Sequence, residues 1–281
     1  MNDKGVKVKD DTSILYFTIP IVILMVTCSS IGILNQGLYS KQTVDWLSQT
    51  IGQDISNIFC VAPILLISAF FASKGNRNAK IIWIGTMITN IYSYVIYCFA
   101  VYFNCLFHVY CLILGLSIFS AINFFIKNVN EDFKSWFTER APTKIIGIFI
   151  FIIAFVFSIM WLAGSLPRAL TNTVPESIIK DGLITNPVQA LDFSFYIPLM
   201  FISSFMIIKK KALGYLLAPM MLVFDGLTAI NIISLMVVTM QKTGSNNVPQ
   251  IIIFSILACV CIGFLYLFLK NISYSLQNIK S

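Results

Sequence analysis

Residues 186–226 read NPVQALDFSFYIPLMFISSFMIIKKKALGYLLAPMMLVFDG, and this stretch decides the fold. Two apolar runs are separated by the basic turn Lys209-Lys210-Lys211, and each run carries one aspartate, Asp192 or Asp225. An apolar run of roughly 20 residues is long enough to cross a bilayer as a helix. A carboxyl group inside such a run is unfavourable in hydrocarbon, and it therefore marks a candidate functional site.

The rest of the chain repeats this alternation of long apolar runs and short polar turns. The 281 residues are 58% hydrophobic and only 11% charged, whereas a soluble domain is about one-quarter charged. The sequence predicts an all-α polytopic membrane protein with one domain over 13–270 and polar tails at 1–12 and 271–281. Its eight predicted transmembrane helices cover residues 13–35, 57–73, 80–102, 105–126, 144–165, 190–208, 212–239 and 250–269.

The nineteen basic residues are divided unevenly between the two sides of this bundle. Fifteen fall on the side of both termini, and only four fall on the other: Lys41, Arg168, Lys180 and Lys242. Because loops rich in Lys and Arg stay in the cytoplasm, we expect a protein of the cell membrane with both termini cytoplasmic. The net charge of +7 follows from this topology, so nucleic acid is not needed as a partner. The predicted partners are the lipid bilayer and a small ion or polar solute, and the oligomeric state stays open.

A short pattern occurs twice in the chain. Pro63-x-x-x-Ile67-Ser68-x-Phe70 recurs as Pro198-x-x-x-Ile202-Ser203-x-Phe205, at an offset of 135 residues that pairs Asn57 with Asp192. This offset indicates two parallel four-helix repeats, 13–126 and 144–270, as in some transporters. A chance match in an apolar background is the open alternative.

Polar side chains gather in the predicted outer half of the bundle. The helical rise of about 1.5 Å per residue places Asp192, Asp225 and His108 roughly 20–27 Å above the cytoplasmic edge. We predict a polar cavity that opens to the outside and is lined by the third, fourth, sixth and seventh helices. The candidate substrate- or ion-binding residues are Asp225, Asp192, Asn90, Tyr94, Tyr97, Asn231, Asn104, His108 and Arg168.

Each candidate also has a structural interpretation. Asp225 is either a binding group or a structural acid, neutral or hydrogen-bonded, that is clamped to Asn90 or a tyrosine. Asp192 suits an N-terminal helix cap, and the tyrosines suit ordinary aromatic packing. Arg168 is a loop charge or the counter-ion of Asp192. His108, with no second histidine to share a metal, suits the membrane interface.

Three connecting segments carry distinctive residues. Residues 36–56 are predicted to be an external loop that Trp46 anchors at the interface. Residues 127–143 alternate in charge around Trp136, which predicts a short amphipathic piece on the membrane surface. Residues 166–189 form the longest predicted connection and are a candidate lid.

Missing motifs argue against several classes of protein. A single histidine cannot provide bis-histidine haem ligation, and the sequence has no G-x-S-x-G, P-loop or G-x-G-x-x-G. Asp225 lies in Val223-Phe224-Asp225-Gly226, without the Gly-x-Gly-Asp context of intramembrane aspartyl proteases. We therefore predict no metal and no cofactor.

Two stretches carry a family resemblance: Tyr92-x-Tyr94-x-x-Tyr97-x-Phe99-x-x-x-Phe103-Asn104-x-x-Phe107-x-x-Tyr110, and Asn186-Pro187-Val188-x-x-Leu191-Asp192 followed by Pro198, the basic turn and Gly214-Tyr215. They resemble a pattern in a group of uncharacterised multi-span bacterial membrane proteins. The resemblance covers roughly residues 50–240. It implies a bacterial cytoplasmic membrane and no particular activity.

The favoured function is that of a small carrier or permease-like protein. Asp225 would titrate or bind a cation, Asp192 would gate the mouth with Arg168, and hydrogen bonds would come from Asn90, Tyr94, Tyr97 and Asn231. One alternative is a membrane enzyme for a lipid or other hydrophobic substrate, with Asp192 and Asp225 as its acid–base pair. Another is a non-catalytic accessory or immunity subunit that binds its partner near Trp136.

Overall fold

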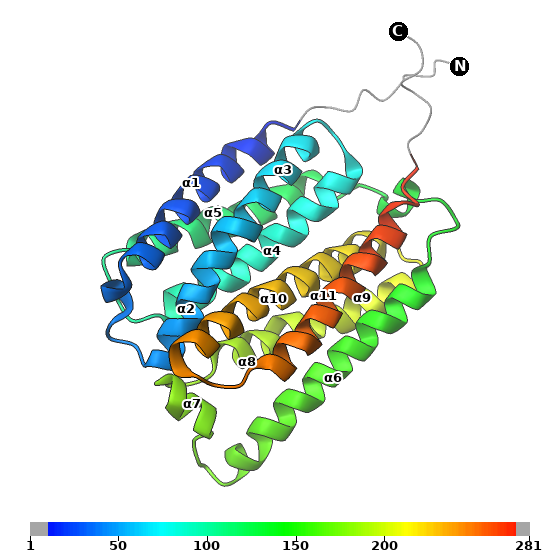
Figure 1. Cartoon of the computed structure of the whole chain (residues 1–281). Coiled ribbons are helices and arrows are strands. Elements are labelled where there is room, and N and C mark those ends of the chain that lie inside the picture. The colour runs from blue at the N-terminus through cyan, green and yellow to red at the C-terminus, as the bar shows by residue number, and fades with distance from the viewer. Residues whose placement is uncertain (1–10, 274–281) are drawn as a thin grey trace, which may run out of the picture.

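The computed structural model describes residues 11–273, which fold into a helical bundle (Figure 1). Eight of its helical segments are long and apolar enough to cross a membrane, which confirms the predicted all-α polytopic class. These segments are α1 (Ser13–Leu34), α2 with α3 (Val44–Ser56 and Ala62–Ser73), α4 (Arg77–Ala100), α5 (Phe107–Lys127), α6 (Thr143–Leu170), α8 with α9 (Pro187–Leu191 and Ile197–Ile208), α10 (Gly214–Thr243) and α11 (Val248–Leu269). Short helices connect them: η1 (Gln36–Tyr39), η3 (Phe133–Trp136) and α7 (Glu176–Asp181).

The second predicted helix, 57–73, is wrong at its start, because the continuous helical segment begins at Val44. Most of the predicted loop 36–56 is therefore the helix α2. Hydropathy missed this helix because it carries polar residues such as Gln49 and Asp54, which the bundle buries partly or wholly. Trp46 is also not an interface anchor. It is buried, and its indole N–H donates a hydrogen bond to the Ala100 carbonyl over 2.9 Å.

Two π-helical turns stand at equivalent places in the sequence. They are η2 (Asn57–Val61) before α3 and η4 (Asp192–Tyr196) before α9, again 135 residues apart. In each copy a proline follows two residues after the turn, Pro63 or Pro198. Proline has no N–H for the usual helical hydrogen bond, and a single wider turn is a common local adjustment. The sequence repeat is therefore accompanied by a repeat of local backbone structure.

The chain forms two groups of helices that meet at α10. The first half of the chain contributes α1 to α5, and the second half contributes α6 to α11 (Figure 1). Within each half the order of packing is the same, because α3 lies between α1 and α4 as α9 lies between α6 and α10. The buried helix α10 packs on α2 and α4 of the first half and on α9 and α11 of its own half.

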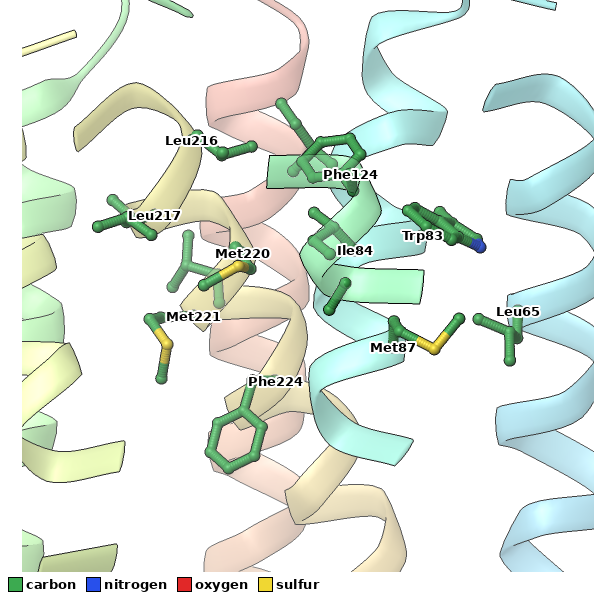
Figure 2. Packing of buried hydrophobic residues seen from close by; sticks show 14 of the residues in the cluster. Leu65, Trp83, Ile84, Met87, Phe124, Leu216, Leu217, Met220, Met221 and Phe224 are labelled. Carbon is green, nitrogen blue, oxygen red and sulfur yellow. The ribbon is translucent and has the colours of Figure 1, made fainter. Parts of the chain in front are cut away.

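The core between the halves is apolar and closely packed. Met220 and Phe224 of α10 belong to the same buried cluster as Ile84 of α4, and Figure 2 shows Met87 and Leu65 pointing toward one another. Small residues allow the closest approach. A Cβ atom on Gly52 of α2 would lie 2.5 Å from the Cα atom of Leu235 on α10. Only glycine fits there without moving one of the two helices.

The ends of the bundle differ in charge. We call the end that carries Lys74, Arg77, Lys127, Lys209 and Lys270 the basic end, and the opposite end the far end. The segment around Trp136 packs against the basic end. Trp136 is buried, and the ring of Phe137 lies 4.5 Å from that of Phe268. Its aromatic side chains therefore face the protein.

The two halves close differently at their outer sides. In the first half α1 packs along α5, which completes a ring of four helices. In the second half, within the described residues, the corresponding helices α6 and α11 barely touch. Their rings meet where Phe149 lies 4.6 Å from Phe264, toward the basic end. The second half is therefore the one with an open side.

Candidate functional site

A cavity lies toward the far end of the bundle, where the two halves meet. We call it the acid cavity; its volume is about 430 Å³ and its wall includes Asp181, Asp192 and Asp225. The first half contributes α2 and α4 to the wall, and the second half contributes α6 to α11. The predicted cavity between the third, fourth, sixth and seventh helices is therefore partly wrong. The fourth helix, α5, takes no part, and the second, fifth and eighth helices do.

Asp192 is held by two aromatic donors from other helices. The Tyr92 hydroxyl of α4 donates to its Oδ1 atom over 3.1 Å, and the Trp161 indole N–H of α6 donates to its Oδ2 atom over 2.7 Å. Asp192 is not the N-terminal cap that was predicted. The cap is Asn186, whose Oδ1 accepts a hydrogen bond from the Gln189 backbone N–H over 3.0 Å. Asp192 lies six residues further on, at the start of the π-helical turn. From the first position of this turn, the Asp192 side chain reaches both Tyr92 and Trp161.

Asp225 is buried in the middle of α10 and has a free hydrogen-bonding atom. The residue is only 7% exposed, and its Oδ2 atom has no hydrogen-bond partner in the described structure. Thr228, one turn along the same wall, also has a buried hydroxyl without a partner. Among the described residues no hydrogen bond joins Asp225 to Asn90 or to a tyrosine. A buried carboxyl is normally hydrogen-bonded, so these atoms are the ones that a ligand or water would satisfy.

Asp181 closes the far end of the acid cavity from the short helix α7. Gln49 of α2 donates from its Nε2 atom to Asp181 Oδ1 over 3.0 Å, and the neighbouring Lys180 forms a 2.8 Å ion pair with Asp45. Burial raises the pKa of Asp181 from 3.8 to about 6, although the Gln49 bond acts to lower it. The predicted lid 166–189 is thus an ordered segment, tied to α2 at two points.

Four predicted hydrogen-bonding residues lie outside the acid cavity. The Asn90 amide donates to the Ser117 hydroxyl over 2.8 Å, between α4 and α5. Asn231 accepts from the Ser56 hydroxyl over 2.6 Å, between α10 and α2. Tyr94 and Tyr97 stack with their ring centroids 5.1 Å apart, on the α5 side of α4. Asn90, Tyr94 and Tyr97 therefore pack α4 against neighbouring helices, and the opposite face of α4 supplies Tyr92 to the cavity wall.

The other three predicted residues lie near the surface of the far end. Asn104 forms a local turn in which its Oδ1 accepts a hydrogen bond from the Leu106 backbone over 2.9 Å. His108 is exposed, and its ring packs beside Phe107 at 5.5 Å. Arg168 is exposed in the last turn of α6 and forms no ion pair with Asp192. The predicted gate of Asp192 with Arg168 is therefore absent.

Sequence reasoning missed a second buried acid, Asp54 of α2. It is 1% exposed and accepts hydrogen bonds from Tyr39 over 2.8 Å and from Tyr97 over 2.7 Å. Tyr110 lies 3.4 Å from Tyr39, hydroxyl to hydroxyl. We call these four residues the tyrosine cluster. The signal that could have found it is the tyrosine stripe on 80–102, which needs a polar partner on a neighbouring helix.

The offset of 135 residues relates the acids of the second half to amides of the first. It pairs Asp192 with Asn57 at the starts of the two π-helical turns, and it pairs Asp225 with Asn90. Asn57 donates to the Ser29 hydroxyl over 3.2 Å in the closed first half. Asn90, like Asp225, has one buried oxygen atom without a partner. The repeat thus places neutral amides in one half and carboxyls in the other.

No protein-family model matches this chain, and no curated protein and no solved structure is significantly similar to it. The functional conclusions below therefore rest on the sequence and on the geometry of the acid cavity.

Proposed function

We propose that this protein is a small carrier or permease-like protein whose binding site for a cation or polar solute is the acid cavity. One observation carries the proposal: Asp225, a buried carboxyl with an unpartnered oxygen atom, lies in the wall of a cavity of about 430 Å³. Ionisable groups inside a membrane most often serve transport or binding when they face such a cavity. Asp225 would hold the cation or the proton, and Asp192 would contribute its charge from the adjoining wall.

The position of the cavity supports transport. It lies between the two halves of the chain, and sites at the interface of repeats are typical of secondary transporters. Rocking of one half against the other would expose such a site to either side in turn.

We place the protein in the cytoplasmic membrane of a bacterium with the basic end inside. The uneven division of basic residues supports this orientation, and the resemblance to uncharacterised bacterial membrane proteins supports the setting. The acid cavity would then open toward the outer half of the bilayer.

Flux through proteoliposomes tests the proposal. Wild type and the Asp225→Asn variant are reconstituted, proton and ion fluxes are followed under imposed gradients, and Asp11→Asn serves as a matched control that removes an acid outside the cavity. We expect flux in wild type and in the control, and none in Asp225→Asn. Equal flux in wild type and Asp225→Asn, both folded, would contradict the proposal.

One further observation favours a second candidate, a membrane enzyme for a lipid or other hydrophobic substrate. Asp192 and Asp225 line the same cavity, and the wall formed by α6 and α11 is the open side of the second half. An acid–base pair there could reach a lipid tail or headgroup. Conversion of bilayer lipids, followed by mass spectrometry and lost in both Asp192→Asn and Asp225→Asn, would favour the enzyme over the carrier.

A further inference from the structure

The wall of the acid cavity combines negative charge with aromatic surface. Its described lining residues include three carboxyls and no Lys, Arg or His. Asp192 and Asp181 are hydrogen-bonded by neutral donors, Asp225 has an unpartnered oxygen atom, and the basic side chain next to Asp181, Lys180, is paired with Asp45. Such a wall attracts cations and repels anions. Seven aromatic residues complete it: Trp46, Tyr92, Phe157, Trp161, Tyr196, Phe224 and Phe254.

Part of the aromatic wall surrounds the carboxyl of Asp192. The rings of Tyr196 and Phe224 stack with centroids 4.4 Å apart, and Tyr92 meets Tyr196 edge-on at 4.8 Å. Tyr92 and Trp161 also hold Asp192 through their polar atoms. Aromatic rings attract organic cations, most strongly where water is excluded. The wall therefore brings aromatic rings and a carboxyl group together at one site.

The cavity fits an organic cation better than a bare metal ion. A calcium ion needs six to eight oxygen ligands that converge on one point, and magnesium needs close to octahedral coordination. Among the described residues no group of three or more His, Cys, Asp or Glu side chains is placed to hold a metal. The volume of about 430 Å³ instead falls within the range of small-molecule pockets, roughly 300–1,000 Å³.

A route from the bilayer leads to the cavity through the open side of the second half. Phe157, Met160 and Gly164 of α6 line the cavity on one edge of this gap, and Phe254 and Leu257 of α11 line it on the other. Met160 is 47% exposed, and a Cβ atom added to Gly164 would meet nothing within 4 Å. Since these residues are apolar, a ligand that already partitions into the membrane can pass between them.

We propose that the acid cavity binds lipophilic organic cations, aromatic ammonium or phosphonium compounds in chemical class, which enter sideways from the bilayer between α6 and α11. As a statement about what is transported, this inference rests on the proposed carrier function. As a statement about binding, it stands on the acids, the rings and the gap alone.

Binding of tetraphenylphosphonium to the purified protein tests the inference without any flux. Tetraphenylborate is the matched probe, because it has the same four phenyl groups and nearly the same size but a negative charge. Equilibrium dialysis in lipid nanodiscs, corrected for empty nanodiscs, gives the affinity for each ion. We expect saturable binding of the cation and none of the anion. Equal binding of both ions would overturn the inference.

Variants locate the binding site. We expect Asp225→Asn to weaken binding at least about tenfold, which corresponds to roughly 1.4 kcal/mol, and Asp225→Glu to retain most of it because the charge is kept. Asp11→Asn, far from the cavity, should bind as wild type does. Gly164→Trp should slow binding by filling the gap. Unchanged affinity in Asp225→Asn, or an unchanged binding rate in folded Gly164→Trp, would overturn the proposed site or the proposed route, respectively.

The binding result and the flux result are independent of one another. Saturable binding of tetraphenylphosphonium without its movement across proteoliposomes would keep the site and reject the carrier. Proton or ion flux that needs Asp225, with no tetraphenylphosphonium binding, would keep the carrier and reject this class of ligand.

Discussion

Asp54 and Asp225 are both carboxyls buried within the bundle, one in each half of the chain, and their surroundings differ. Tyr39 and Tyr97 donate to the two oxygen atoms of Asp54, which lies inside the tyrosine cluster. Asp225 leaves Oδ2 without a partner and lines a cavity. A fully hydrogen-bonded carboxyl joins helices, whereas a partly bonded one is available to a ligand. The first half is therefore structural at its acid, and the second half contains the proposed binding site.

The helices around the two acids differ in the same sense. In the first half α1 packs along α5 and closes the ring, and the residues paired with Asp192 and Asp225 are the neutral Asn57 and Asn90. In the second half α6 and α11 have little contact, and the equivalent residues are the acids Asp192 and Asp225. The two halves thus share a packing order and a π-helical turn but differ at their acids and at their outer sides. The predictions below test this contrast, beginning with the largest expected effect.

Removing each acid should have opposite effects on stability. Asp54→Leu leaves the Tyr39 and Tyr97 hydroxyls without their acceptor, and each buried unpaired group costs about 1–3 kcal/mol. Asp225→Leu removes a buried polar group that was itself unpartnered, which is neutral or stabilising. Heating in detergent, followed by size-exclusion chromatography, should give a lower apparent Tm for Asp54→Leu alone. A larger loss in Asp225→Leu would reverse the assignment of the two halves.

A pair of glycines tests the packing of the two helices that occupy equivalent places, α1 and α6. A Cβ atom on Gly32 would lie 2.6 Å from the Tyr39 hydroxyl and would also strike the Asp54 carboxyl, whereas one on Gly164 would meet nothing. Overpacking a filled site costs about 1–3 kcal/mol. Gly32→Ala should therefore lower the apparent Tm, and Gly164→Ala should leave it unchanged. A loss of stability in Gly164→Ala would show that the gap beside α6 is filled.

Most of the fold could be predicted from the sequence because seven of the eight spans are continuous apolar runs. The second span could not, because its first half is α2, whose polar residues Gln49, Gln53 and Asp54 lower its hydropathy while the bundle buries them partly or wholly. Hydropathy measures the cost of exposing a residue to lipid. It does not register that a polar residue faces a partner on another helix.

Two of the three acids in the cavity wall could be predicted from the sequence. Asp192 and Asp225 stand out as carboxyls in apolar runs, and both do line the acid cavity. Trp161 does not stand out, because an aromatic residue in an apolar run looks like packing. Asn90 and Asn231 were placed in the wrong environment, since helical spacing shows which residues share a face but not which neighbour that face meets. Asp54 was missed because it was assigned to a loop.

A smaller effect is expected at Asp181, which ties the far end of the second half to α2. Its raised pKa means that the folded protein binds the proton more tightly than the unfolded chain does. The contribution of Asp181 to stability is therefore greatest below about pH 4 and falls as the pH rises toward about 6, after which it is constant. The other charged groups nearby are Asp45, Lys180 and Glu176.

The Asp181→Asn variant isolates this contribution. Between pH 4.5 and pH 7.5 the apparent Tm should fall more in wild type than in the variant. Other titrating groups act on both proteins alike, so the difference reports Asp181. An equal fall in the two proteins would mean that Asp181 is already solvated like a surface acid. The second half would then be open at its far end as well as at its side.

The smallest effect is expected at Asp11, which ties α1 to α5 at the basic end of the first half. Lys127 donates to Asp11 over 2.7 Å, and Ser13 bonds both residues. Burial raises the pKa of Asp11, but the bonds from Lys127 and Ser13 outweigh it, so the pKa lies below its usual value. The stabilisation is therefore present above about pH 4 and is lost as the pH falls through the lowered pKa, opposite in sign to Asp181.

Because the Lys127 side chain is 41% exposed, the pair should contribute less than about 1 kcal/mol. Asp11→Asn should accordingly lower the apparent Tm only slightly at pH 7 and in low salt, and the difference should shrink further at high salt as the charges are screened. A loss as large as that of Asp54→Leu would mean that the Asp11–Lys127 ion pair is what holds α1 against α5. A small loss would mean that α1 and α5 are held together by their packing along the helices, an extended contact that α6 and α11 lack.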